Sequence, residues 1–231
     1  MKIQERRKLP EESKSSTNLE FSVRIPVGSV RLEGALNVPG GADAVVLFAH
    51  GSGSSRFSPR NNYVAEVLQK AGLATLLFDL LTEQEDRIYE NRFNIPLIGH
   101  RLIIATKWIE DYSETKGRRI GYFGASTGAA AALLAAAEMR EDIAAIVSRG
   151  GRPDLAEPYL HSVHAPTLLI VGERDDVVIK LNQDAFQRIT AEKDLVIVPG
   201  ASHLFEEPGR LEDVARLATN WFTRYFQKII M

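Results

Sequence analysis

Hydrophobic and polar residues alternate along the first part of the chain and then give way to continuous apolar runs. The alternation over residues 19–25 and 30–38 predicts an antiparallel strand pair with one solvated face. Continuous apolar runs are expected of strands that are buried on both faces of a parallel sheet. The further strands predicted in this way are residues 44–49, 73–79, 118–123, 143–148, 166–172 and 195–198.

Helical periodicity separates most of these strands. Ser58 and Pro59 form a typical helix start, and Gly72 ends the first helix. Because strands alternate with helices, we expect right-handed βαβ units in a doubly wound, mainly parallel α/β sheet. We interpret residues 19–231 as a single domain and the charged, serine-rich residues 1–18 as a flexible N-terminal extension. The other predicted helices are residues 96–112, 129–138, 179–190 and 211–226, and residues 80–94 are predicted to form a polar loop.

The sequence Gly124-Ala125-Ser126-Thr127-Gly128 lies between a predicted strand and a predicted helix. A G-x-S-x-G sequence in this setting is typical of a nucleophile elbow, a turn so tight that its flanking positions must be small. The elbow would hold the Ser126 hydroxyl at a helix N-terminus, where free N–H groups favour negative charge. We therefore predict that Ser126 is a nucleophile.

A serine hydroxyl needs a general base, and the base needs an acid to orient it. Of the five histidines, His203 follows the last predicted strand, at the sheet edge where ligands bind. The loop after the preceding strand contains Glu173, Asp175 and Asp176. We select Asp175 as the acid, keep Asp176 in reserve and favour Glu173 least. The alternative interpretation of these carboxylates is a solvated loop or a helix cap.

An oxyanion hole requires two N–H donors directed at the developing charge. The backbone of Thr127, directly after the serine, should supply one donor. The second should come from the loop His50-Gly51-Ser52-Gly53 after an earlier strand. We assign it to Ser52, with Gly53 as the alternative, and interpret His50 as a residue that braces this loop.

Arg149 and Arg152 follow another strand and are therefore expected at the same edge of the sheet. Guanidinium groups bind carboxylates and phosphates in a bidentate manner, so both arginines are candidate substrate-binding residues. The alternative is ion pairing with a nearby acid such as Asp154, Glu157 or Asp175.

The order Ser126, Asp175, His203 along the chain is the order found in α/β-hydrolases. The chain resembles the dienelactone-hydrolase-like group of that superfamily, and the similarity spans about residues 20–227. Enzymes called dienelactone hydrolases use a cysteine nucleophile, whereas this chain has a serine and no cysteine. The resemblance implies the α/β-hydrolase fold and a catalytic triad. It is carried by residues 50–53, 124–128, 172–178 and 200–209.

The net charge and the apolar runs of the chain indicate which partners and which location to expect. The net charge of −2 gives no general attraction to nucleic acid or to an anionic membrane. The N-terminus has no apolar signal region, and no apolar run approaches the roughly 20 residues of a membrane span. We expect a cytoplasmic protein without nucleic-acid or membrane partners. The segment 151–166 is too short for a large cap domain, so the site should be open unless residues 80–95 or a partner subunit of a homo-oligomer covers it.

Together these features predict a serine hydrolase that cleaves a small-molecule carboxylic ester through an acyl-enzyme, without a metal or organic cofactor. Two alternatives stay open. The same triad also serves acyl transfer and the cleavage of amides or thioesters. A catalytically silent or engineered scaffold with this fold is the other alternative.

Overall fold

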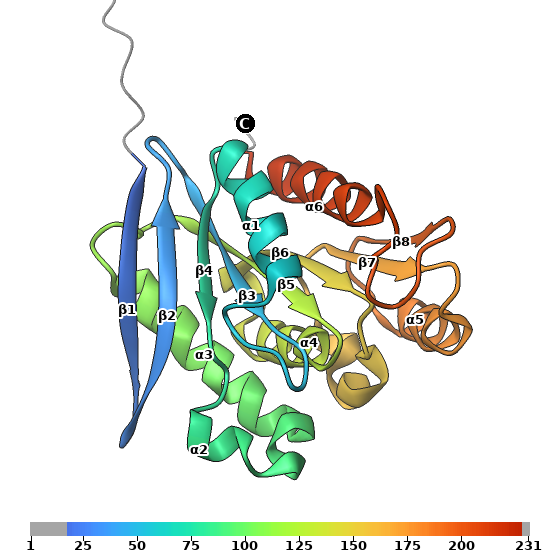
Figure 1. Ribbon diagram of the computed structural model, residues 1–231, viewed down its shortest axis with the longest axis horizontal. Coiled ribbons are helices and arrows are strands. Elements are labelled where there is room, and N and C mark those ends of the chain that lie inside the picture. The colour runs from blue at the N-terminus through green and yellow to red at the C-terminus, as the bar shows by residue number, and fades with distance from the viewer. Residues whose placement is uncertain (1–17, 228–231) are drawn as a thin grey trace, which may run out of the picture.

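The structure, a computed structural model, describes residues 18–227. The predicted extension falls almost entirely on residues 1–17, which lie outside this range. The described chain forms one eight-stranded sheet in the order β1-β2-β4-β3-β5-β6-β7-β8 (Figure 1). The pairings β1–β2 and β2–β4 are antiparallel and the others are parallel, which confirms the predicted fold class. The strands are β1 (Leu19–Val27), β2 (Val30–Val38), β3 (Ala44–Ala49), β4 (Ala74–Phe78), β5 (Arg119–Ala125), β6 (Ile143–Arg149), β7 (Thr167–Gly172) and β8 (Lys193–Val198).

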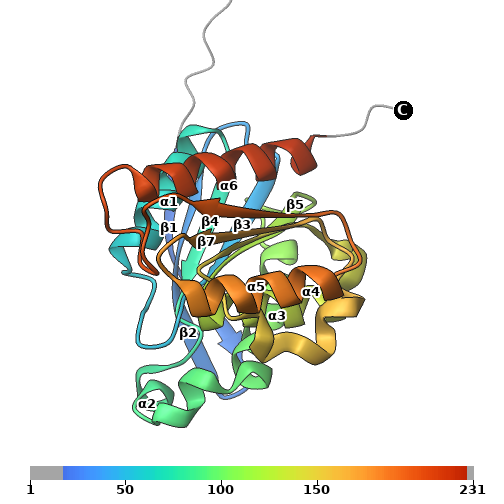
Figure 2. The ribbon, with the colours of Figure 1, turned by 90° about the vertical axis from the view of Figure 1, so that its right-hand side faces the viewer.

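Helices cover both faces of the sheet. In Figure 2, α1 and α6 lie on one side of the strands, and α3, α4 and α5 lie on the other. The α-helices are α1 (Pro59–Lys70), α2 (Glu83–Asp86), α3 (Ile95–Asp111), α4 (Thr127–Met139), α5 (Asp176–Arg188) and α6 (Arg210–Phe226). Short 3-10 helices are η1 (Tyr89–Phe93), η2 (Arg140–Asp142) and η3 (Pro153–Ser162).

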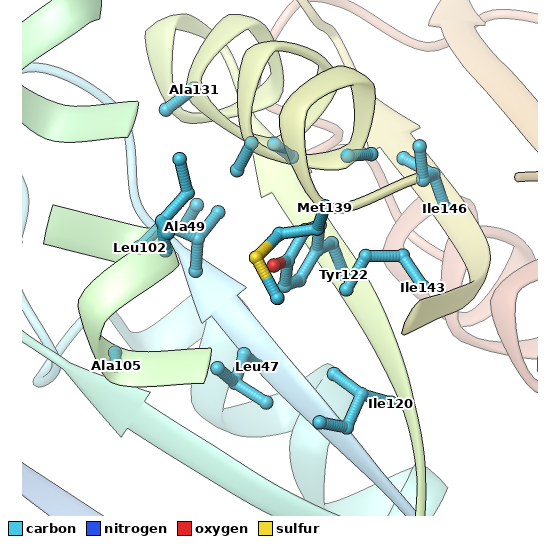
Figure 3. Packing of buried hydrophobic residues seen from close by; sticks show 14 of the residues in the cluster. Leu47, Ala49, Leu102, Ala105, Ile120, Tyr122, Ala131, Met139, Ile143 and Ile146 are labelled. Atoms are coloured by element: carbon cyan, nitrogen blue, oxygen red, sulfur yellow. The ribbon is translucent and has the colours of Figure 1, made fainter. Parts of the chain in front are cut away.

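The period-two geometry of the strands divides the core into two hydrophobic layers. Leu47 and Tyr122 point to the layer under α3 and α4, where Figure 3 shows them packed near Leu102 and Met139. Phe48, the residue after Leu47, belongs to the layer under α1 and α6 instead. Continuous apolar strand sequences are therefore required, because neighbouring residues fill opposite layers.

Helix α4 follows the elbow and is buried on nearly every side. Its alanines allow it to pack closely against the sheet, α3 and η3. The apolar character of this helix therefore reflects its place in the core. Within the described range, no helix has both the length and the apolar character that crossing a membrane requires.

Several helical elements differ from the predicted ones. The predicted loop at residues 80–94 contains α2 and η1. Thr82 and Glu85 form a capping box, a Thr-x-x-Glu signal that could have identified this helix from the sequence. Helix α5 begins at Asp176 instead of near Ile179, because Asp175 occupies the N-cap position.

Candidate active site

Ser126 occupies a sharp turn between β5 and α4. Its backbone has φ 52° and ψ −121°, a conformation outside the ordinary regions for a residue with a side chain. Such strain persists only where the surrounding structure fixes it, and it is typical of functional sites. One support is the hydrogen bond from Ser126 N to Arg149 O at 3.2 Å, which ties the elbow to β6.

The glycines on either side of Ser126 are required by close backbone packing. A Cβ atom on Gly124 would lie 2.4 Å from the Cα of Ala129. A Cβ atom on Gly128 would lie 2.1 Å from the carbonyl oxygen of Ala49. Neither contact is compatible with a real side chain, so the elbow can form only with glycine at both positions.

His203 and Asp175 are joined at the same edge of the sheet. The distance between His203 Nδ1 and Asp175 Oδ2 is 2.6 Å. Asp175 stands at the N-cap of α5, but its side chain accepts no hydrogen bond from that helix. Its carboxylate is therefore available to orient the imidazole. Because Nδ1 is engaged, Nε2 is the ring nitrogen left to exchange a proton with a nucleophile.

The loop that carries His203 is held by two glutamates. Glu207 accepts the backbone N–H of Ser202 at 3.1 and 3.0 Å, and this hydrogen bonding lowers the pKa of the Glu207 carboxyl. Glu173 accepts the N–H of Gly200 at 2.7 Å. The sequence analysis assigned no role to Glu207. The available signal was the stretch 203–209, which begins with His203 and contains Glu207.

Gly150 connects the surroundings of Ser126 and His203. It directly follows Arg149, whose carbonyl binds Ser126 N, and a Cβ atom on Gly150 would lie 3.4 Å from Nδ1 and Cε1 of His203. The serine and histidine thus flank one short backbone segment. Within residues 18–227, no hydrogen bond joins Ser126 Oγ to His203 Nε2. Such bonds are often long in ligand-free enzymes and tighten when substrate binds.

The loop after β3 runs alongside the serine. A Cβ atom on Gly51 would lie 3.1 Å from Ser126 Cβ and 3.8 Å from its Oγ. This close approach requires glycine and places the following backbone beside the nucleophile. Ser52 and Gly53 line a small pocket together with the buried Thr127. The three predicted oxyanion residues therefore lie around one pocket.

Two side chains hold this loop to the end of β4. Leu80 N donates to His50 Nε2 at 3.1 Å, and His50 Nδ1 lies 3.0 Å from Gly51 O. This arrangement fits a neutral imidazole with its proton on Nδ1, and burial lowers the pKa of His50 accordingly. Arg56 donates its backbone N–H to Asp79 Oδ1 at 2.8 Å and also pairs with it through the guanidinium. The two hydrogen bonds of His50 match its predicted role as a residue that braces this loop.

The segment containing α2 and η1 forms the outer wall of the pocket. Arg92 donates to Asp86 Oδ1 and Oδ2 at 2.9 and 2.7 Å, and its Nη1 lies 3.7 Å from the position that a Cβ atom on Gly53 would take. The sequence interpretation did not assign Arg92 to the site, since its position depends on how the segment folds. The pocket is lined by His50, Gly51, Ser52, Gly53, Leu80, Leu81, Asp86, Arg92, Ile98 and Thr127.

The two candidate substrate-binding arginines have different surroundings. Arg152 donates two hydrogen bonds to the carboxylate of Asp154, at 2.8 and 2.7 Å, and this pairing raises its pKa. Arg152 therefore forms an ion pair with Asp154, which was the alternative to substrate binding for this residue. Arg149 is buried, and its Nε and Nη1 have no hydrogen-bond partner among the described residues.

The sheet order, the crossover helices and the elbow after β5 define an α/β-hydrolase fold. The sequence profile of the dienelactone hydrolase family matches residues 34–229, and the chain belongs to this family. A solved dienelactone hydrolase from Anabaena variabilis is 56% identical, with a TM-score of 0.88 over 91% of this chain and 99% of that one. The family match and the structural similarity thus agree on the fold of the chain.

A further relative and a further solved structure add to this comparison. A Mycobacterium tuberculosis protein named putative phosphoribosyl transferase is 58% identical over 200 residues, which are 87% of this chain and 45% of that protein. The matched residues thus span less than half the length of this relative. An esterase from Pyrococcus furiosus shares the fold with a TM-score of 0.71 at 22% identity, over 90% of this chain and 94% of that one.

Proposed function

We propose that the chain is a serine hydrolase that cleaves carboxylic esters through an acyl-enzyme intermediate. The observation that carries this proposal is the 2.6 Å contact between His203 and Asp175 at the sheet edge that also bears the strained Ser126. A nucleophile, a base and an orienting acid are the parts that acyl transfer to serine needs.

In the acylation step, Ser126 Oγ attacks the acyl carbon while His203 Nε2 accepts the hydroxyl proton. Asp175 holds the ring and stabilises the imidazolium that forms. The oxyanion of the tetrahedral intermediate accepts hydrogen bonds from the N–H of Thr127 and from that of Ser52 or Gly53. The intermediate then collapses, the bond to the leaving oxygen breaks, and His203 returns its proton to the departing alcohol.

Deacylation repeats these steps with water as the nucleophile. Water attacks the acyl carbon and gives a proton to His203, and a second oxyanion forms in the same hole. When the bond to Ser126 Oγ breaks, His203 protonates that oxygen and the carboxylic acid leaves. Every step uses groups of this chain and one water molecule.

A fluorophosphonate probe tests the proposal, because it forms a stable bond only with an activated serine. We expect labelling of the native protein and its loss in Ser126→Ala and His203→Ala. Ser113→Ala, at an exposed serine beyond the end of α3, is the matched control and should label normally. An unlabelled native protein, or equal labelling of Ser126→Ala, would overturn the assignment.

The activity named for the Mycobacterium relative gives a second candidate, phosphoribosyl transfer. The matched segment makes up 45% of that protein, so its name describes a chain about twice as long as this one. Release of pyrophosphate from phosphoribosyl pyrophosphate decides between the candidates. If this chain released it at the same rate with and without Ser126→Ala, the transferase would be the better assignment.

A further inference from the structure

The pocket beside Ser126 lies on one side of the nucleophile, and His203 lies on the other. In the sheet, β3 and β4 flank one edge of β5, whereas β6, β7 and β8 lie beyond its other edge (Figure 1). The pocket is lined by the segments that follow β3 and β4, by α3 and by the start of α4. Within residues 18–227, none of its lining residues belongs to the loops after β7 and β8, where Asp175 and His203 lie.

The position of the base decides which part of an ester each side receives. In the proposed mechanism His203 returns its proton to the leaving oxygen, so the alcohol portion of the tetrahedral intermediate must face His203. The oxyanion faces the N–H groups of Thr127 and of Ser52 or Gly53. The remaining substituent, the acyl chain, is then directed away from His203, toward β3 and β4. The pocket is therefore the place for the acyl chain.

This pocket is small, and its wall is largely apolar. Its cavity volume is about 10 Å³, close to the least that one water molecule needs. Leu80, Leu81 and Ile98 are buried and supply the apolar wall. A methyl group is similar in size to a water molecule, so the pocket fits the methyl group of an acetyl ester and leaves no room for a longer chain.

The wall is held in place by its surroundings. Leu80, Leu81 and Ile98 all belong to the core layer under α3 and α4, and Leu80 N also donates to His50. On the polar side, Arg92 and Asp86 are joined by two hydrogen bonds. Because protein interiors are close-packed, a longer acyl chain could enter only if part of this core moved.

The side of the nucleophile that receives the alcohol is open. The side chain of His203 is 38% exposed, and the neighbouring Leu204 is exposed as well. An alcohol portion that faces His203 therefore extends toward solvent. The size limit that the pocket imposes on the acyl chain does not apply to the alcohol.

We propose that this hydrolase is selective for esters of short carboxylic acids, with acetyl esters preferred, and that Ile98 and Leu81 set the limit on acyl length. The inference rests on the proposed ester hydrolysis at Ser126. Both side chains determine specificity by contact with the acyl chain and take no part in the proton transfers. The alcohol portion of the substrate can be large.

Two esters that share a leaving group and differ in acyl length test the proposal: p-nitrophenyl acetate and p-nitrophenyl hexanoate. For the native protein, we expect kcat/KM for the acetate to exceed that for the hexanoate roughly 10- to 100-fold. Ile98→Ala enlarges the pocket and should lower this ratio about 10-fold, mainly by improving cleavage of the hexanoate. Ile98→Val should lower the ratio less, and it supplies the test if Ile98→Ala does not fold.

The matched control is Ile103→Ala. Ile103 is buried in the same helix and the same core layer as Ile98 but lies outside the residues that line the pocket. Ile103→Ala should lower the melting temperature about as much as Ile98→Ala does and leave the acetate-to-hexanoate ratio unchanged. Equal kcat/KM for the two esters in the native protein would overturn the proposal, and so would an equal fall of the ratio in both variants.

Binding separates a failure of this proposal from a failure of the proposed hydrolysis. Ethyl acetate and ethyl hexanoate are titrated into the Ser126→Ala protein, with and without Ile98→Ala, and binding is followed by ligand-observed NMR. We expect Ile98→Ala to strengthen binding of ethyl hexanoate about 10-fold and to leave that of ethyl acetate unchanged. This gain would support the acyl pocket even if neither p-nitrophenyl ester were cleaved. Equal binding of ethyl hexanoate to both proteins would place the acyl chain outside the pocket and contradict the proposal, even if both esters were cleaved.

Discussion

The imidazole of His203 and the carboxylate of Asp175 lie 2.6 Å apart, although 28 positions separate the two residues in the chain. The loops after β7 and β8 bring them together because the carboxyl ends of neighbouring parallel strands meet at one edge. The contact fixes which ring nitrogen carries the proton. It therefore makes the assignment of Asp175 over its neighbour Asp176 testable.

Replacing Asp175 with asparagine should lower kcat for p-nitrophenyl butyrate by roughly 10³- to 10⁴-fold. The amide can hold His203 in the wrong tautomer, and it does not stabilise the imidazolium that forms during the reaction. The KM should change little, since the substrate does not contact this side chain in the proposed mechanism. Steady-state kinetics at neutral pH measure both constants. Asp176→Asn, one residue further into α5, is the control, and an equal loss there would transfer the role to Asp176.

The strands were predictable because burial on both faces leaves an unambiguous sequence pattern. Residues 44–49 were predicted as a buried strand, and β3 spans Ala44–Ala49. Segments in which short-range polar contacts decide the conformation were less predictable. The α2 and η1 helices depend on Thr82, Glu85 and Asn91, whose side chains bind nearby backbone. The sequence of this segment has no hydrophobic periodicity that would have predicted these helices.

The site was predictable as far as topology determines it. Strand ends converge on one edge, so the serine after β5, the acid after β7 and the histidine after β8 were expected together. The choice of side-chain partners was not predictable. Arg152 pairs with Asp154, whereas none of the ion pairs within residues 18–227 includes Arg149. The roles of the individual site residues stay predictions until variants are assayed.

Adding one methyl group at Gly128 should destabilise the protein by about 3 kcal/mol or more, at or beyond the upper end for overpacking. The Cβ atom of Gly128→Ala would lie 2.1 Å from Ala49 O and 2.5 Å from His50 O, and both contacts are with backbone. Urea unfolding followed by circular dichroism measures the change.

The control for this change is Gly117→Ala, where a Cβ atom meets nothing within 4 Å. Its backbone has φ 74°, so alanine there should cost only about 1–2 kcal/mol from the left-handed conformation. A Gly128→Ala protein as stable as Gly117→Ala would contradict the packing argument for the elbow.

Acid should destabilise the protein partly through His50. Burial lowers its pKa below the usual value of 6.5, and the charges of Asp79 and Asp86 offset only part of this effect. Between pH 6.5 and the folded-state pKa, the unfolded chain therefore binds more protons at this position than the folded one. The contribution of His50 is fully present above about pH 6.5 and is lost as the pH falls through that window.

Melting temperatures from pH 8 to pH 5 measure this dependence. We expect His50→Gln to be less stable than the native protein at pH 8 and to lose less stability on acidification. His100→Gln, at an exposed histidine of α3, is the control and should follow the native curve. Parallel curves for the native protein and His50→Gln would show that His50 does not titrate in this range.

Glu85 should be the main anchor of the pocket wall formed by α2 and η1. Its carboxylate binds Arg101 Nη2 at 2.5 Å and also closes the capping box with Thr82. The side chain of Arg101 is only 10% exposed, so Glu85→Ala would leave a largely buried cation without its partner. We expect a loss of about 3 kcal/mol, the lower end of the range for breaking a buried pair.

The neighbouring acid supplies the matched control for Glu85→Ala. Among residues 18–227, Glu83 pairs only with Arg87, and the two side chains are 84% and 72% exposed. Glu83→Ala should therefore change stability by less than about 0.5 kcal/mol. Because Arg92 of the same segment lines the pocket, Glu85→Ala should also raise KM severalfold and expose residues 83–93 to limited proteolysis. Unchanged KM and proteolysis in a destabilised Glu85→Ala protein would mean that the pocket wall is held by its other contacts, chiefly the Arg92–Asp86 pair.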